Sequence, residues 1–286
     1  MKPTSIPDLS DAVRQLDQVE IVGAGTKRMF GLPIGGKPRM LDLTGLTGIV
    51  EIWEEDQVAV ARAGTPLEEL QEALKAKGQC LPYPDPEMFG PHIAGFPGTV
   101  GGLVAMNLPH GLYAQCGGPR DWVLGLTLIR GNGAIAKCGS HAVKNVAGYD
   151  VQKLLVGSRG ALGLIAEVIF RTYPLRALPS PDVRALRQLD KRPVWIQRTL
   201  PMNFQNAWKA IPQENIFAYD PASSTIWAWC KTTGELPRYP EDWVLRGGCG
   251  PGNFSIDNKN TAKLMKRAKS ALDPENKFNP GVMGVV

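Results

Sequence analysis

The chain has 286 residues, of which 43% are hydrophobic and 21% are charged, and its formal net charge is +5. This length and composition predict a globular protein with one large domain or two modest ones. No apolar run approaches the roughly 20 residues that a membrane-spanning helix requires, and the first ten residues lack the apolar run of a signal peptide. We therefore expect a cytoplasmic protein without direct membrane insertion.

The basic and cysteine residues exclude several classes of partner and site. Basic side chains cluster only at Lys263, Lys266, Arg267 and Lys269, and this helical spacing favours a solvated face over a nucleic-acid patch. The five cysteines are odd in number and none forms a Cys-x-x-Cys pair. This argues against a disulfide framework, a zinc site or an iron–sulfur cluster bound by this chain alone, so we expect no metal site.

The first candidate binding element follows a short apolar stretch, 19–22, which predicts a buried strand. The next five residues are small or able to donate hydrogen bonds: Gly23, Ala24, Gly25, Thr26 and Lys27. A turn of this kind lets backbone N–H groups approach a phosphate closely. The third glycine of a dinucleotide-binding fingerprint is replaced by Arg28, so an ordinary tight turn stays open as the alternative.

A second glycine motif, at 31–37, has the spacing of a P-loop, Gly-x-x-x-x-Gly-Lys. The residue that follows is Pro38, where a P-loop needs Ser or Thr to bind magnesium. Proline also disfavours helical geometry at Lys37, where the P-loop helix would begin. The sequence therefore argues against a nucleotidase.

A helix is predicted after two strands within 49–63. Thr65 is placed to cap it, Pro66 suits its first position, and Glu68 completes a capping box. Leucines at 67, 70 and 74 give an apolar stripe, and Gly78 ends the helix. This helix is interpreted as structural.

The stretch 95–163 concentrates glycines in clusters at element ends. Between the clusters, 122–130 and 134–138 predict two strands joined by the hairpin turn Asn132-Gly133, and 162–172 predicts another strand. Glycine weakens regular elements, so repeated clusters indicate unusual backbone dihedrals or close approach to a bound group. A flat, phosphate-bearing cofactor is the candidate for that group.

The remainder of the chain is less regular. Prolines at 174, 179 and 181 mark a boundary. Beyond it we expect strands of a small second unit at 194–199, 216–219, 225–230 and 243–246. A helix is predicted at 261–271, with Leu264 and Ala268 on one face.

Taken together, the motifs resemble the FAD-binding domain of the vanillyl-alcohol oxidase-like flavoproteins, also called the PCMH-type family, and within it the FAD-binding subunits of glycolate oxidase. The resemblance covers about 15–175 and resumes at about 260–283. It rests on six motifs in this order: Gly64-Thr65-Pro66, Thr99-Val100-Gly101-Gly102, Arg120-Asp121, Lys144-Asn145-Val146-Ala147-Gly148-Tyr149-Asp150, Gly157-Ser158 with Gly160-Ala161-Leu162-Gly163, and Asp273-Pro274 with Asn279-Pro280-Gly281.

The resemblance implies an α+β fold, in which two β-containing subdomains with flanking helices clamp an extended FAD. It divides the chain into a PCMH-type FAD-binding domain at 1–174, a reduced cap or substrate-domain remnant at 175–255, and a C-terminal helix and tail at 256–286 that return to the FAD domain.

The resemblance also implies which residues bind FAD. The turn from Gly23 to Lys27 would hold the pyrophosphate, and Asn279 would reach back to the flavin. The ribityl and isoalloxazine side would be lined by Pro86, Thr99, Gly101, Gly102 and Asn107. The adenosine and pyrophosphate side would be lined by Gly157, Gly160, Leu162, Gly163 and Ile165.

Departures from the family limit the expected activity. The histidines are His92, His110 and His141, and none lies in the pyrophosphate turn, so the FAD is expected to be non-covalent. Members that oxidise 2-hydroxy acids carry a large cap with a histidine cluster, whereas 175–255 has no histidine here. General-base chemistry on a hydroxy acid usually needs such a group near the flavin, so no catalytic residue is assigned.

The resemblance therefore favours an FAD-binding subunit of a glycolate or D-lactate dehydrogenase complex. Its partners would be a catalytic flavoprotein subunit that oxidises the 2-hydroxy acid and an iron–sulfur subunit, and these could attach it to a membrane. Two alternatives stay open: a self-sufficient FAD-dependent hydroxy-acid dehydrogenase, and a scaffold subunit that has lost FAD.

Overall fold

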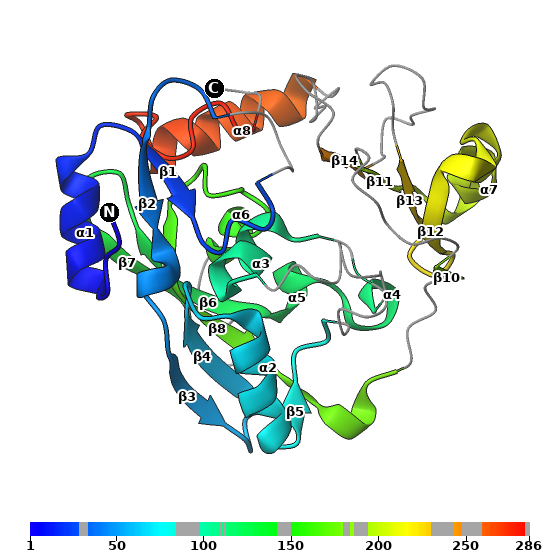
Figure 1. Ribbon diagram of the computed structural model, residues 1–286, viewed down its shortest axis with the longest axis horizontal. Helices are drawn as coiled ribbons and strands as arrows, with labels where there is room; N and C mark the ends of the chain where they lie inside the picture. The colour runs from blue at the N-terminus through cyan, green and yellow to red at the C-terminus, as the bar shows by residue number, and fades with distance from the viewer. Residues whose placement is uncertain are drawn as a thin grey trace.

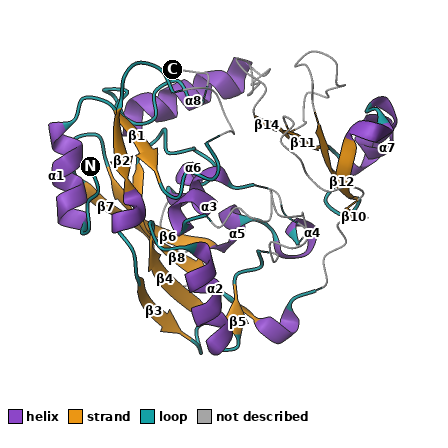
Figure 2. Ribbon diagram, viewed as in Figure 1, coloured by secondary structure: helices purple, strands orange, loops and turns teal. Residues whose placement is uncertain are grey.

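A computed structural model describes ten segments of the chain: 1–28, 34–83, 98–108, 110, 112–141, 150–179, 184–185, 194–229, 243–247 and 259–283. Figure 1 shows their arrangement and Figure 2 their secondary structure. Among the described helices, none is both long and apolar enough to span a membrane.

The main sheet is antiparallel and has five strands in the spatial order β3-β4-β8-β6-β7. Their bounds are β3 (Ile49–Trp53), β4 (Val58–Arg62), β6 (Val123–Ile129), β7 (Ile135–Gly139) and β8 (Leu164–Arg171). The β6–β7 hairpin turns at Asn132-Gly133, as predicted, and the Gly133 N–H donates to the Arg130 carbonyl at 2.8 Å. The strands predicted within 49–63, 122–138 and 162–172 are therefore confirmed.

Helices pack against this sheet and share one apolar core with it. They are α1 (Ile6–Gln15), α2 (Leu67–Ala76), α3 (Val100–Met106), α5 (Pro119–Trp122) and α6 (Gln152–Leu155), with α4 (Tyr113–Cys116) beside them (Figure 2). The leucines at 67, 70 and 74 are buried in that core, as their spacing predicted. Burial of such side chains, at about 25 cal/mol per Å² of apolar surface, holds the helices on the sheet.

The prediction that Thr65 caps α2 is wrong. Pro66 occupies the cap position, and no side chain accepts a hydrogen bond there, so the predicted capping box with Glu68 does not form. Thr65 is fully buried, and its hydroxyl forms two hydrogen bonds with Gly48 instead. The hydroxyl accepts from the Gly48 N–H at 3.0 Å and donates to the Gly48 carbonyl at 3.1 Å. A tertiary contact has replaced the local cap.

A two-stranded parallel sheet near the N-terminus lies beside the C-terminal tail. It consists of β1 (Val19–Val22) and β2 (Arg39–Asp42). The C-terminal tail runs alongside β1, because the Val19 N–H donates to the Lys277 carbonyl at 2.8 Å and the Asn279 N–H donates to the Val19 carbonyl at 2.9 Å. The predicted C-terminal helix, α8 (Lys259–Leu272), precedes this tail.

A second antiparallel sheet lies apart from the first in Figure 1. Its strands, in spatial order, are β10 (Arg184–Ala185), β12 (Ile216–Asp220), β13 (Thr225–Trp229), β11 (Val194–Arg198) and β14 (Trp243–Gly247). The predicted strands of the second unit are all present. The helix α7 (Pro201–Ala210), which the sequence analysis missed, packs Phe204 and Ala207 against this sheet. The guanidinium of Arg198 lies over the Tyr113 ring of the first unit, 4.5 Å from its centroid.

A short strand pairing and the first helix complete the described fold. Strand β5 (Gln79–Cys80) pairs with β9 (Tyr173–Pro174). Helix α1, also missed by the sequence analysis, begins at Ser5, whose hydroxyl accepts from the Asp8 N–H at 3.2 Å. Ser10 then fixes α1 to the β6–β7 turn by donating to the Gly133 carbonyl at 2.6 Å.

A buried ion pair fixes the C-terminal tail in place. The Lys269 ammonium lies 2.6 Å from the Asp273 carboxylate and also donates to the carbonyls of Ala161 and Phe278 at 2.6 and 2.9 Å. The carboxylate in turn accepts from the N–H groups of Lys277 and Phe278. Both side chains are almost fully buried, so each charge depends on the other for its compensation.

Replacing Lys269 with methionine is expected to destabilise the fold by about 3 kcal/mol, because it leaves the Asp273 carboxylate buried without a counter-charge. Urea unfolding measures the change. The double variant Lys269→Met/Asp273→Asn should recover part of the loss, and Lys266→Met, on the exposed side of the same helix, should have little effect. Equal midpoints for Lys269→Met and Lys266→Met would contradict this role.

Candidate functional site

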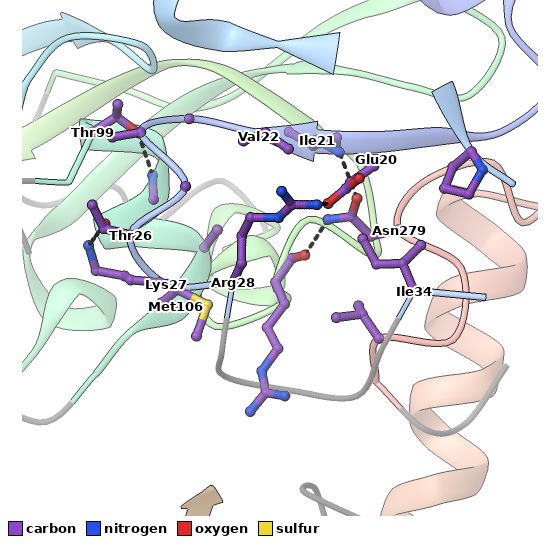
Figure 3. A pocket seen from close by; sticks show the side chains of 18 residues that line it. Glu20, Ile21, Val22, Thr26, Lys27, Arg28, Ile34, Thr99, Met106 and Asn279 are labelled. Carbon is purple, nitrogen blue, oxygen red and sulfur yellow. Dashed lines mark hydrogen bonds and ion pairs between the residues drawn. The ribbon is translucent and has the colours of Figure 1, made fainter. Parts of the chain in front are cut away.

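The candidate site is a cavity of about 450 Å³ between β1, the turn that follows it, α3 and the C-terminal tail (Figure 3). It is lined by Glu20, Ile21, Val22, Gly23, Ala24, Gly25, Thr26, Lys27, Arg28, Ile34, Pro38, Thr99, Gly102, Ala105, Met106, Arg159, Asn279 and Val282. The structure therefore brings the whole predicted phosphate turn, 23–27, together with Thr99, Gly102 and Asn279.

The turn after β1 presents backbone donors to this cavity. Within the described part of the chain, no hydrogen bond is made by the N–H groups of the four residues from Gly23 to Thr26. Gly25 has a φ of +73°, a left-handed conformation that glycine adopts without steric cost. Successive N–H groups in such a turn form a concave site for an anion.

Close packing between the turn and α3 explains why small residues are needed here. A Cβ atom on Gly23 would clash with the Thr99 hydroxyl, and one on Gly102 would lie 3.3 Å from the same oxygen. Thr99 caps α3, and its hydroxyl accepts from the Gly102 N–H at 3.2 Å. The turn after β1 and helix α3 therefore pack against each other through Thr99. Larger side chains at Gly23 or Gly102 would disturb this packing beside the cavity.

Three cationic side chains line the cavity: Lys27, Arg28 and Arg159. Burial lowers the pKa of Lys27 to about 8 and that of Arg159 to about 10, because a low-dielectric environment disfavours the charged form. The Glu20 carboxylate also lies at the cavity, but it is paired with the exposed guanidinium of Arg28 (Figure 3). The arrangement offers positive charge and N–H donors to an anionic ligand.

Asn279 holds the cavity wall together from the C-terminal tail. Its side-chain oxygen accepts from the Ile21 N–H at 2.7 Å, and its side-chain nitrogen donates to the Arg159 carbonyl at 2.7 Å (Figure 3). Asn279 is buried and has a φ of +40°. It therefore joins β1 to the 157–163 turn while lining the cavity.

Other predicted site residues pack against protein atoms in this structure. A Cβ on Gly101 would lie 2.9 Å from the Ala63 Cβ, and one on Gly160 would lie 2.7 Å from the Asn279 side-chain nitrogen. Gly163 packs against Leu128, and Ile165 is buried in the core as part of β8. These four residues bring the helices, the sheet and the turn together around the cavity and do not line it.

The remaining predicted residues lie elsewhere. Gly157 and Leu162 line a second cavity, which also touches Asn279. Asn107 ends α3 in a left-handed conformation, with a φ of +48°, and lies beside Gly157. Pro86 is outside the described residues.

The sequence analysis missed several lining residues. Arg159 stood within the quoted glycine motif but was not assigned, although a cation between glycines beside a predicted phosphate site was a usable signal. Two other missed residues are charged, Glu20 and Arg28. The rest are apolar: Ile21, Val22, Ile34, Pro38, Ala105, Met106 and Val282. No local pattern distinguishes such apolar wall residues from core residues.

The two described histidines lie away from this cavity. His110 is buried among the rings of Tyr83, Tyr113 and Trp122, and burial lowers its pKa to about 3. His141 packs edge-on against Trp53, with ring centroids 4.8 Å apart. His92 lies outside the described residues. No group of metal-binding side chains occurs in the described part of the chain.

Comparisons with known proteins identify an FAD-binding domain in the first half of the chain. A family profile described as FAD binding domain matches residues 1–139. The glycolate oxidase subunit GlcE of Escherichia coli (strain K12) is 35% identical over 169 residues, which are 59% of this chain and 46% of that protein. The glycolate oxidase subunit GlcD of Bacillus subtilis (strain 168) is 30% identical, over 59% of this chain and 38% of the other.

A further relative and a solved structure also match this chain. A D-lactate dehydrogenase of Archaeoglobus fulgidus is 29% identical over 197 residues, which are 64% of this chain and 42% of that protein. A solved structure of an alkyldihydroxyacetonephosphate synthase aligns with a TM-score of 0.48 at 16% identity, covering 74% of this chain and 37% of the other.

The matched regions are less than half the length of these curated relatives. The relatives are named as glycolate oxidase subunits and a D-lactate dehydrogenase, and the matching profile covers β1, the turn after it and α3, which build the cavity. Residues 1–139 are therefore similar to an FAD-binding domain, in agreement with the PCMH-type α+β fold and the FAD cofactor that the motifs predicted.

Proposed function

We propose that this chain is a non-covalent FAD-binding subunit of a glycolate or D-lactate dehydrogenase complex. A longer flavoprotein subunit would oxidise the 2-hydroxy acid, and an iron–sulfur subunit would take up the electrons. The chain would act in the cytoplasm, or at a membrane through these partners. The observation that carries the proposal is the cavity beside β1. It is lined by residues 23–26, whose N–H groups form no hydrogen bond in the described part of the chain, and by the cations Lys27 and Arg159.

The donor set of this cavity fits the diphosphate of FAD. Backbone N–H groups and cations are the groups that bind phosphate oxygens, and the glycines keep the backbone within reach of them. Lys27 and Arg159 would compensate the negative charge, and the 23–26 turn would fix its position. FAD would supply the capacity to accept and pass on electrons, whereas these residues only bind and orient it.

The described histidines support the need for a separate catalytic subunit. A general base must reach the proton that it removes and must be able to accept it. His110 is buried, and its pKa of about 3 makes it a poor proton acceptor at neutral pH, and neither His110 nor His141 lines the cavity. We therefore assign cofactor binding to this chain and substrate oxidation to its partner.

The purified full-length chain should be yellow, and acid precipitation should release all of its flavin into the supernatant. Under anaerobic conditions, glycolate or D-lactate should not bleach this flavin until the catalytic subunit is added. A yellow pellet would show covalent attachment. Bleaching by the chain alone would show a self-sufficient dehydrogenase, and a colourless protein that takes up no added FAD would show a scaffold.

Replacing Lys27 with methionine should weaken FAD binding roughly 10- to 100-fold, because hydrogen bonds to charged groups contribute about 1.5–3 kcal/mol. Titration of the flavin-free chain with FAD, followed by flavin fluorescence, measures the dissociation constant. Lys37→Met is the matched control, since Lys37 is exposed and does not line the cavity. Equal loss in both variants would point to general electrostatics instead.

FAD affinity should also fall as the pH rises above about 8. The pKa of Lys27 is about 8 without ligand, and a neighbouring diphosphate would raise it, so FAD binds the protonated form more tightly. The affinity should therefore be constant below pH 8 and decline by up to tenfold per pH unit above it. In Lys27→Met the decline between pH 8 and 9 should disappear, and its persistence would assign it to another group.

A further inference from the structure

A second cavity, of about 370 Å³, lies between α6, the 157–162 turn and α8. Most of its lining is apolar: Leu154, Val156, Ala161, Leu162, Leu264, Met265, Ala268 and Met283. Figure 1 shows α6 and α8 as neighbours, although they are about a hundred residues apart in the chain. We call this feature the α6–α8 groove.

The two walls of the groove each expose a leucine. Leu154 of α6 is 50% exposed and Leu264 of α8 is 61% exposed. Single exposed apolar side chains are common on protein surfaces, but here two of them flank an apolar depression. Such a combination is typical of a site where a partner inserts apolar side chains.

Of the residues that line the groove, Arg120, Lys153 and Lys269 are basic and none is acidic, and the exposed side of α8 is basic as well. The helix contains no Asp or Glu, and Lys263, Lys266 and Arg267 are exposed and form no ion pair with the described part of the chain. On the opposite wall, Arg120 is exposed and donates only to the Lys153 carbonyl, at 3.1 Å. Among the described residues, Asp150 contacts this wall and is paired with Lys153 at 2.8 Å.

Apolar anchors within a basic rim define the chemistry of the occupant. A segment with two or three apolar side chains on one face and carboxylates on its flanks would fill the groove and pair with the rim. Opposite charges of this kind guide association and fix the orientation of the partner. A second copy of this chain would instead bring a second basic α8 to the rim, which is unfavourable.

We propose that the α6–α8 groove is the docking surface for an acidic, amphipathic segment of a partner protein. The inference rests on the proposed function, because the catalytic flavoprotein subunit is the expected owner of that segment. The groove is separate from most of the cofactor cavity: only Asn279 lines both. Changes at Leu264 or Arg267 should therefore leave FAD binding intact.

The test uses the full-length chain, affinity-tagged and expressed in its own organism, and compares four forms: wild type, Leu264→Glu, Lys266→Glu/Arg267→Glu, and Met202→Glu. Met202 on α7 is the matched control, since it is 80% exposed and lies outside the groove. FAD content and the retained second chain, identified by mass spectrometry, are measured for each. A photoreactive amino acid in place of Leu264 then identifies the peptide that occupies the groove.

The groove variants should retain at least tenfold less of the partner at unchanged FAD content, while Met202→Glu should behave as wild type. Retention by wild type should also decrease at high salt, as expected for paired charges. The cross-linked peptide should come from the retained chain and carry more acidic than basic residues. Loss in Leu264→Glu without loss in Lys266→Glu/Arg267→Glu would overturn the acidic character of the segment.

A cross-link to a second copy of the chain, or to a bound small molecule, would also overturn the proposal. If wild type retains the catalytic subunit and the groove variants do so equally, only this inference fails. If wild type carries FAD but retains no second chain, the partner assignment of the proposed function fails together with it.

Discussion

The buried pair of Lys269 and Asp273 is the interaction on which the site depends. It binds the Ala161 carbonyl of the 157–163 turn and the N–H of Phe278 in the tail, so it fixes the two segments that Asn279 then joins to β1. A buried pair of charges is rarely a net source of stability, because desolvation offsets the attraction. Here its effect is geometric, since only one arrangement of the tail satisfies both charges. The cavity beside β1 therefore requires both ends of the chain.

The glycines of the family motifs fall into two physical classes. Gly25 lines the cavity away from close protein contacts, so its small size leaves room for a ligand, whereas Gly23 and Gly102 line the cavity and also pack against Thr99. Gly101 and Gly160 instead let a helix and a turn approach Ala63 and Asn279 so closely that a Cβ atom would not fit. In the sequence both classes look the same, because a glycine indicates that a side chain would not fit but does not indicate whether protein or ligand atoms fill the space. A glycine that packs against protein can still be essential for cofactor binding, through the shape of the wall.

Local patterns predicted the strands well, because period-two burial and a hairpin turn such as Asn132-Gly133 depend on neighbouring residues only. The same reasoning failed at Thr65, whose hydroxyl bonds to Gly48, a residue distant in sequence. Helix α7 was missed because its apolar face is narrow, with Phe204 and Ala207 as its buried residues. Arg159 was not predicted because no periodic pattern marks it, and its link to the cavity wall is the tertiary contact of its carbonyl with Asn279. Residues that act through tertiary contacts leave no periodic signal.

Helix α8 connects the two proposals physically. Its buried Lys269 positions the wall of the cofactor cavity, and its exposed Leu264 lines the groove. A partner that binds the exposed side would restrict the motion of the helix, and FAD would restrict the motion of the wall that the helix supports. If each reduces the conformational freedom that the other must remove, their binding free energies are coupled, and the coupling is reciprocal. Such coupling would change the affinity for FAD without emptying the site, so a subunit that has lost its partner would still carry FAD.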